Sequence, residues 1–193
     1  ALAKHVYSLH LGFNLYNVGT TGGIVGTLYY VMLKGFGFEI SPVMHWSKEY
    51  TELLFPVLLV YLLSLIILGL FLDGNINSLK KITNETGRLI TDFVEVGGMG
   101  SVLINMGLLG LIGLTYVKLV GGDINGPVIA GIFTMVGFGA LGKHVKNVIP
   151  IMLGVYLMCI PKIWLHNEPG PLLAGLFGTT LAPFCGRFGP AIG

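Results

Sequence analysis

The chain has 193 residues, of which 53% are apolar and 10% are charged, whereas about 25% of the residues in a soluble domain carry a charge. This composition predicts an integral membrane protein and excludes an ordinary soluble fold. The net charge of +2 is small and spread over loops, without the Lys/Arg clusters or aromatic platforms that nucleic-acid binding needs, so nucleic acid is excluded as a partner.

The first predicted membrane segment covers residues 11–33, which carry no charge over 23 positions and are long enough to span a bilayer. On one continuous helix Asn14, Asn17 and Thr21 share a face, and buried amides need hydrogen-bond partners. Two roles stay open for this face: bonding between the helices of a bundle, or lining a solute pathway. Small residues let helices approach closely in lipid, so we expect helix contacts at the glycines of this segment. These are Gly19, Gly22 and Gly26.

Two further predicted spans cover residues 53–72 and 93–120. The first carries no charge over 20 positions, which is the length needed to cross the hydrocarbon. The second contains Asn105, Gly107 and Gly110 in an N-x-G-x-x-G pattern that also begins at Asn17. Internal repeats are common in transporters, so this repetition is a candidate trace of duplication. We expect close helix contact at the two glycines here as well.

A shorter apolar run, residues 126–142, lies between two polar, glycine-rich hinges. Its 17 uncharged residues would reach only about 25 Å as a helix, against about 30 Å of hydrocarbon. A broken or re-entrant element and a short tilted helix both fit. If this run forms a hairpin with residues 148–164, the turn holding Lys143 and His144 lies inside the membrane region; if both runs cross, the turn lies in a loop.

Polar residues near these glycine breaks are the candidate site residues. Ionisable groups near membrane depth are costly, so they are functional hypotheses by default. Asn and His side chains can exchange hydrogen bonds with a small polar solute, and lysines can attract an anionic one. The candidates are His10, Asn14, Asn17, Asn105, Asp123, Asn125, Lys143, His144 and Asn147.

Motifs of catalysis and metal binding are absent from the sequence. It has no H-E-x-x-H, no G-x-S-x-G and no phosphate-binding lysine loop, so we expect no enzyme activity. Cys159 and Cys185 have no metal-ligand spacing, and we expect neither a metal nor a cofactor.

Three functions remain in order of preference. The first is a transporter or channel for a small polar solute, and the second is a structural or assembly subunit of a membrane complex. The third is a membrane-embedded enzyme using His10 or His144. The expected partners are the lipid bilayer and the solute, with a homo-oligomer left open. The expected fold is all-α, a polytopic transmembrane helical bundle of about five to six membrane segments, some short, broken or re-entrant.

Two stretches also carry a family resemblance. They are 10–19, and 125–151 with its Asn-Gly-Pro, Gly-Phe-Gly and Gly-Lys-His motifs. Together they resemble an uncharacterised family of bacterial multi-pass inner-membrane proteins, catalogued as a domain of unknown function. Members are longer and have two related halves, so the resemblance implies a fragment of one transmembrane domain. Residues 1–72 would then be the end of one half and residues 73–193 most of the second.

Overall fold

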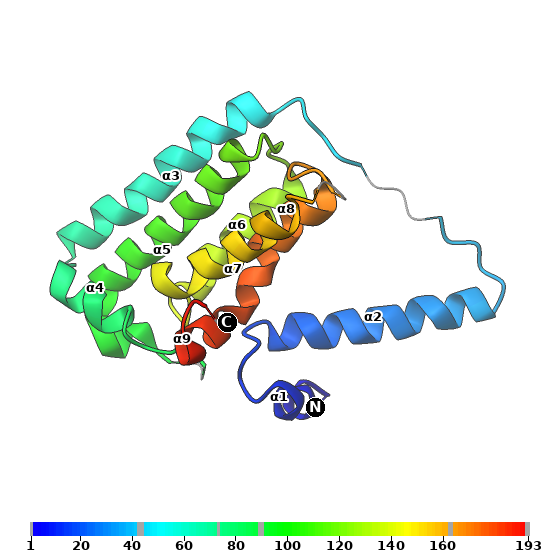
Figure 1. Ribbon diagram of the computed structural model, residues 1–193, viewed down its shortest axis with the longest axis horizontal. Helices are drawn as coiled ribbons and strands as arrows, with labels where there is room; N and C mark the ends of the chain where they lie inside the picture. Colours follow the sequence, from blue (N-terminus) through cyan, green and yellow to red (C-terminus); the bar gives the residue numbers. More distant parts are fainter. Residues whose placement is uncertain (1, 42–44, 73, 89–90, 162–163, 192–193) are drawn as a thin grey trace.

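The computed structural model describes residues 2–41, 45–72, 74–88, 91–161 and 164–191, and every regular element in these ranges is helical (Figure 1). The predicted all-α class is confirmed. The elements are α1 (Leu2–His10), α2 (Asn17–Gly35), α3 (Thr51–Phe71), α4 (Ile76–Ile82), α5 (Phe93–Leu119), α6 (Gly126–Phe138), α7 (Val145–Met158), α8 (Pro169–Phe177), the 3-10 turn η1 (Gly178–Leu181) and α9 (Ala182–Phe188).

Helices α3 and α5 are the two described helices that are long and apolar enough to cross a membrane. They lie side by side and antiparallel (Figure 1). Glycines of α5 allow the approach, because a Cβ on Gly107 would lie 2.8 Å from the carbonyl oxygen of Leu62 and one on Gly110 would lie 2.2 Å from Leu62 Cδ2. The predicted close contacts at Gly107 and Gly110 are therefore confirmed.

The amino end of α5 is kinked. Gly98 has φ 78° and ψ 158°, a backbone conformation that L side chains rarely adopt. The turn before it is anchored by Phe93, which is fully buried and whose backbone N–H donates to the carbonyl of Ala140 at 3.1 Å. The beginning of the long helix is thus tied to the segment that follows α6.

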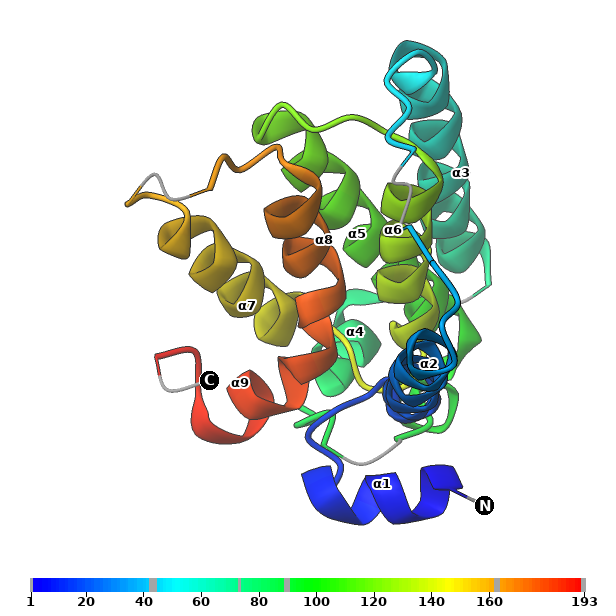
Figure 2. The same cartoon turned by 90° about the vertical axis from the view of Figure 1, so that its right-hand side faces the viewer.

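Helices α6 and α7 are short, with 13 and 14 residues, so they reach about 20 Å each. The predicted run 126–142 therefore forms a helix that stops at Phe138, followed by the hinge 139–144. In the predicted partner run 148–164, residues 162–163 lie outside the described part of the chain. Figure 2 shows α3 at one side of the bundle and α7 at the other, with α5, α6 and α8 between them.

The first predicted segment is not one helix. The chain leaves α1 after His10 and enters α2 at Asn17, with Leu11 (φ 51°) and Gly12 (φ 81°) in the left-handed region. Asn14 therefore lies before α2, and its predicted helical face with Asn17 and Thr21 is wrong. The local reason is that segment 11–16 forms hydrogen bonds elsewhere, with backbone and side chain of Thr180.

Helix α2 projects from the bundle and has no buried residue (Figure 1). The predicted contacts at Gly19, Gly22 and Gly26 are absent among the described residues: a Cβ on Gly22 or Gly26 would meet nothing within 4 Å, and one on Gly19 would touch only Tyr16, the residue that precedes α2. The expected division into residues 1–72 and 73–193 stays a prediction, and residue 73 lies outside the described ranges. Since α3 and α5 pack together, both pieces share one core.

Candidate functional site

Three breaks between helices meet around the side chain of Lys143. They are segment 11–16 between α1 and α2, hinge 139–144 between α6 and α7, and η1 between α8 and α9. The Lys143 ammonium donates hydrogen bonds to Tyr16 Oη and, at 2.7 Å, to Thr179 Oγ1. The backbone N–H of Tyr16 donates to Thr180 Oγ1 at 3.0 Å. We call the meeting point of Asn14, Tyr16, Lys143, Thr179 and Thr180 the Lys143 site.

Lys143 is fully buried and its surroundings are neutral. Its Nζ lies 4.3 Å from the ring centroid of Tyr16 and 5.5 Å from that of Phe138, so two aromatic faces flank the charge. The buried polar residues of the described chain include no Asp or Glu. A charge buried without an opposite charge is costly, which makes this lysine difficult to explain by packing alone.

Two asparagines hold the hinge beneath Lys143. Asn105, on α5, donates from Nδ2 to the carbonyls of Gly139 at 2.7 Å and Lys143 at 2.8 Å. Asn147 donates from Nδ2 to Gly142 O at 2.9 Å and accepts from the His144 N–H at 2.9 Å. These two predicted site residues therefore satisfy the backbone groups that the broken helix leaves unpaired.

Asn14 joins the Lys143 site from the first break. Its Oδ1 accepts from Thr180 Oγ1 at 2.5 Å and from the Tyr16 N–H at 2.9 Å, and its Nδ2 donates to Thr20 Oγ1 at 2.8 Å. His10 and Asn17 form a separate contact of 3.1 Å that ties α1 to α2. All three predicted amides, at positions 14, 17 and 105, are bonded to protein, as their polarity requires.

His144 faces the other side of the hinge, where a cavity of about 500 Å³ opens. Its Nε2 lies 2.9 Å from the carbonyl oxygen of Glu85, and its buried Nδ1 has no hydrogen-bond partner among the described residues. Lys146, at the rim, donates to Asn84 Oδ1 at 3.2 Å. The cavity is therefore bounded by the amino end of α7, the loop that follows α4 and the last turn of α9.

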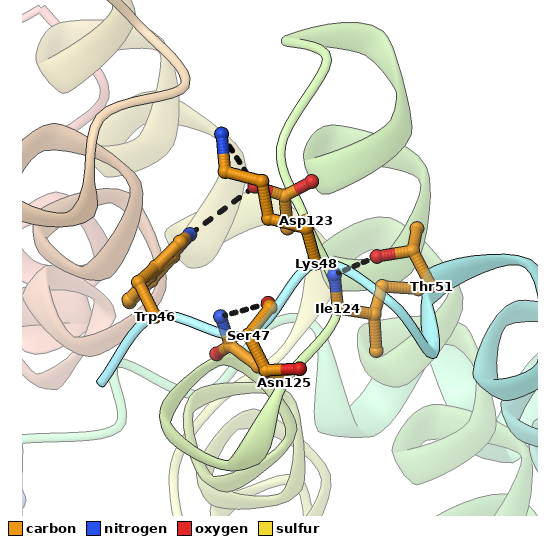
Figure 3. Close-up of polar contacts among 7 residues, drawn as sticks. All are labelled: Trp46, Ser47, Lys48, Thr51, Asp123, Ile124 and Asn125. Carbon is orange, nitrogen blue, oxygen red and sulfur yellow. Dashed lines mark hydrogen bonds and ion pairs between the residues drawn. The ribbon is translucent and has the colours of Figure 1, made fainter.

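Asp123 and Asn125 lie at the opposite end of α6, away from Lys143. Trp46 Nε1 donates to Asp123 Oδ2 at 3.2 Å, and Lys48 Nζ lies 3.8 Å from the same oxygen. Figure 3 shows both contacts as dashed lines. Asn125 donates to Ser47 O at 3.3 Å and caps α6. These contacts tie the segment before α3 to the turn before α6, so the structure does not bring these two candidates to the Lys143 site.

Sequence reasoning missed the hydroxyl groups of the Lys143 site, which belong to Tyr16, Thr179 and Thr180. One signal was present: two threonines stand between Gly178 and Pro183 at the end of an apolar run, a composition that favours a helix break. Within the described residues, no group of three or more His, Cys, Asp or Glu side chains is placed to hold a metal ion.

A protein-family model described as "Protein of unknown function (DUF1576)" matches residues 1–35 and 72–192. The matched ranges include all three helix breaks and exclude the whole of α3. No curated protein and no solved structure matches the chain. The resemblance to an uncharacterised family, expected from the motifs around Asn14 and Lys143, is confirmed.

Proposed function

We propose that this chain, which belongs to the DUF1576 family of proteins of unknown function, is a multi-pass protein of the bacterial inner membrane that carries a small polar solute through the Lys143 site. The observation that carries the proposal is the fully buried Lys143 at the meeting point of three helix breaks. Ionisable groups and irregular backbone at membrane depth mark the solute sites of many transporters.

The depth of the hinge follows from the pairing of α3 with α5. A Cβ on Gly69 would lie 2.5 Å from Gly100 O, and a Cβ on Gly107 would lie 2.6 Å from Ile66 Cγ1. Asn105 lies between these two contacts, level with the last two turns of α3, which is about 5–10 Å inside the end of that helix. If the 21 residues of α3 cross the hydrocarbon, the hinge carbonyls bound to Asn105 lie within it.

This depth favours a re-entrant hairpin for α6 and α7. Helix α6 reaches about 20 Å and ends beside Asn105, and after the hinge α7 runs away from it. Non-helical backbone at membrane depth is tolerated only where protein or a wet cavity satisfies it. Asn105 and Asn147 supply those bonds here. If α2, α3, α5 and the pair α8 and α9 are four crossings, and α6 and α7 add one or two segments as a hairpin, the proposed bundle has five to six membrane segments.

An assembly subunit is the second candidate, and α2 is the observation that favours it. This helix has no buried residue, and three of its glycines, Gly22, Gly23 and Gly26, have open space where a Cβ would lie. Small residues on an apolar helix are typical of helix–helix contacts in membranes. A homo-oligomer or a partner protein would then cover α2, and the polar groups around Lys143 would serve packing.

Uptake by proteoliposomes separates the two functions. The purified protein is reconstituted and offered radiolabelled urea, methylammonium, formate and phosphate, which together sample neutral, cationic and anionic solutes. We expect uptake of at least one solute above that of protein-free liposomes, and its loss in a Lys143→Met variant. Lys118→Met is the matched control, because Lys118 is an exposed lysine near the far end of α5. A protein that is folded yet carries none of these solutes contradicts the transport proposal.

A further inference from the structure

We propose that the solute is a small anion and that the Lys143 ammonium is the positive charge that binds it. This inference rests on the proposed transport function and narrows it to one class of substrate. The anion is defined by its charge and its hydrogen-bond acceptors, as in a small carboxylate or an inorganic oxyanion.

The charge at Lys143 is unbalanced. Its hydrogen-bond partners are two hydroxyl oxygens, of Tyr16 and Thr179, which accept from two of its three N–H groups and leave its charge uncompensated. No acidic side chain appears among the buried residues that the structure describes, and the ion pair between Lys48 and Asp123 lies at the other end of α6. A cationic solute would meet a like charge here, whereas an anion would supply the missing opposite charge.

Two helix ends hold the ammonium in place before the anion binds. Helices α6 and α8 both end at the site, so their carbonyl ends carry partial negative charge toward it. Thr179 links the ammonium to one of these ends, since its hydroxyl accepts from Lys143 and donates to Leu176 O at 2.6 Å. Partial charges and aromatic faces can keep the lysine in place, and they leave a full negative charge to be provided by the solute.

Two helices also begin near Lys143. Tyr16 is the residue that precedes α2, and His144 is the residue that precedes α7. Both helices are longer than ten residues, with 19 and 14, so each brings a positive amino end to the region around Lys143. In transporters with broken helices, such ends point at anionic groups of the substrate.

The cavity beside the hinge offers a route to Lys143. Its volume of about 500 Å³ is in the range of small-molecule sites. Lys146 and the amino end of α7 make its rim positive, and Glu85 is the acidic residue in the lining. His144 lines the cavity, and its buried Nδ1 lacks a partner among the described residues. We therefore expect a polar group of the solute to form a hydrogen bond with this side chain.

The hinge separates this cavity from the lysine. The bond from Asn147 Nδ2 to Gly142 O, at 2.9 Å, fixes the backbone between the cavity and the buried side chain. Lys143 is fully buried, so the structure represents a closed arrangement in which the hydroxyls of Tyr16 and Thr179 occupy the places of the anion's acceptor oxygens. Binding an anion at the ammonium requires the hinge or the loop after α4 to move.

The test compares charge classes in the wild type and in three variants. Proteoliposomes are offered radiolabelled formate, phosphate, urea and methylammonium, and thermal stability in detergent is measured with the sodium salts of formate and phosphate at constant ionic strength. We expect uptake of formate or phosphate, not of urea or methylammonium, and a rise in Tm with the same anion. Lys143→Met should weaken the apparent affinity for the anion by about tenfold to a hundredfold, because one charged hydrogen bond is lost. Lys143→Arg keeps the charge and should retain anion selectivity, and Lys118→Met should behave as the wild type.

The outcomes separate this inference from the function on which it rests. Uptake of urea or methylammonium without any effect of the anions would overturn the anion proposal and leave transport standing. Uptake of none of the four solutes would overturn both. An anion effect that is equally strong in Lys143→Met would show that another group binds the anion. The selectivity of the wild type decides the class of solute even if a variant does not fold.

Discussion

Asn105 allows the hinge to be tested by its contribution to stability. In the variant Asn105→Ala, two hinge carbonyls lose their donors, which now lie 2.7 Å and 2.8 Å away. The position is fully buried, so water does not replace the amide. A buried polar group left unpaired costs about 1–3 kcal/mol, and two carbonyls give about 2–6 kcal/mol. The variant also removes Asn105 Oδ1, a buried acceptor without a partner among the described residues, and this reduces the loss.

Measurements on another membrane protein give a lower limit for the loss of stability expected in Asn105→Ala. Hydrogen bonds between membrane helices average about 0.6 kcal/mol in double-mutant cycles, so the two bonds of Asn105 should contribute at least about 1 kcal/mol. We therefore expect Asn105→Ala to lower the free energy of unfolding by about 1–5 kcal/mol, measured by denaturant titration in detergent micelles. The control is Asn84→Ala, which removes one exposed amide and should change stability by less than about 0.5 kcal/mol. Equal stability of the two variants would refute the view that Asn105 holds the hinge.

Three other predictions follow from the packing. Gly110→Leu should destabilise the protein by about 1–3 kcal/mol or more, since even a Cβ there would lie 2.2 Å from Leu62 Cδ2. Gly22→Leu is the control and should leave the stability of the monomer in detergent unchanged, because a Cβ at Gly22 would meet nothing within 4 Å. Lys143→Met should leave Tm equal or higher, because an apolar side chain of similar volume often replaces a buried charge without loss; a large drop in Tm would show that the charge itself stabilises the fold. A cysteine at exposed position 146 should react quickly with a membrane-impermeant thiol reagent and one at buried position 144 slowly, and equal rates would identify the hinge as an ordinary surface loop.

Hydropathy predicted the long helices well. The run 53–72 and the run 93–120 became α3 and α5 because their length and apolar content leave few other arrangements. Hydropathy gave a wrong prediction for residues 11–33, because their uncharged composition predicts one continuous helix. Nothing in that composition indicates that Leu11 and Gly12 adopt positive φ, because the break is stabilised by Thr180, which lies far along the chain. Contacts at that sequence distance are invisible to local periodicity.

The candidate site shows the same limit. Polarity next to glycine breaks placed Lys143, His144 and Asn147 at a hinge and Asn105 in the third span, and the structure brings these four residues together. Asp123 was included because it also follows a pair of glycines, yet it stands at the other end of α6 and bonds to Trp46. The sequence can indicate where a helix is broken. Only the folded path of the chain shows which of these breaks lie close together.

One loop connects segment 11–16, the hinge and α9, and it limits how the Lys143 site can open. This loop, residues 83–88, packs so tightly that a Cβ on Gly12 would lie 2.3 Å from Arg88 O and a Cβ on Gly186 would lie 2.1 Å from Thr86 O. A Cβ on Gly87 would lie 2.1 Å from Gly142 O in the hinge. The loop therefore touches the backbone of segment 11–16, of the hinge and of α9 at positions where only glycine fits. Movement of the hinge away from Lys143 must displace the loop, and through it segment 11–16 and α9, so the hinge, segment 11–16 and α9 act as one unit.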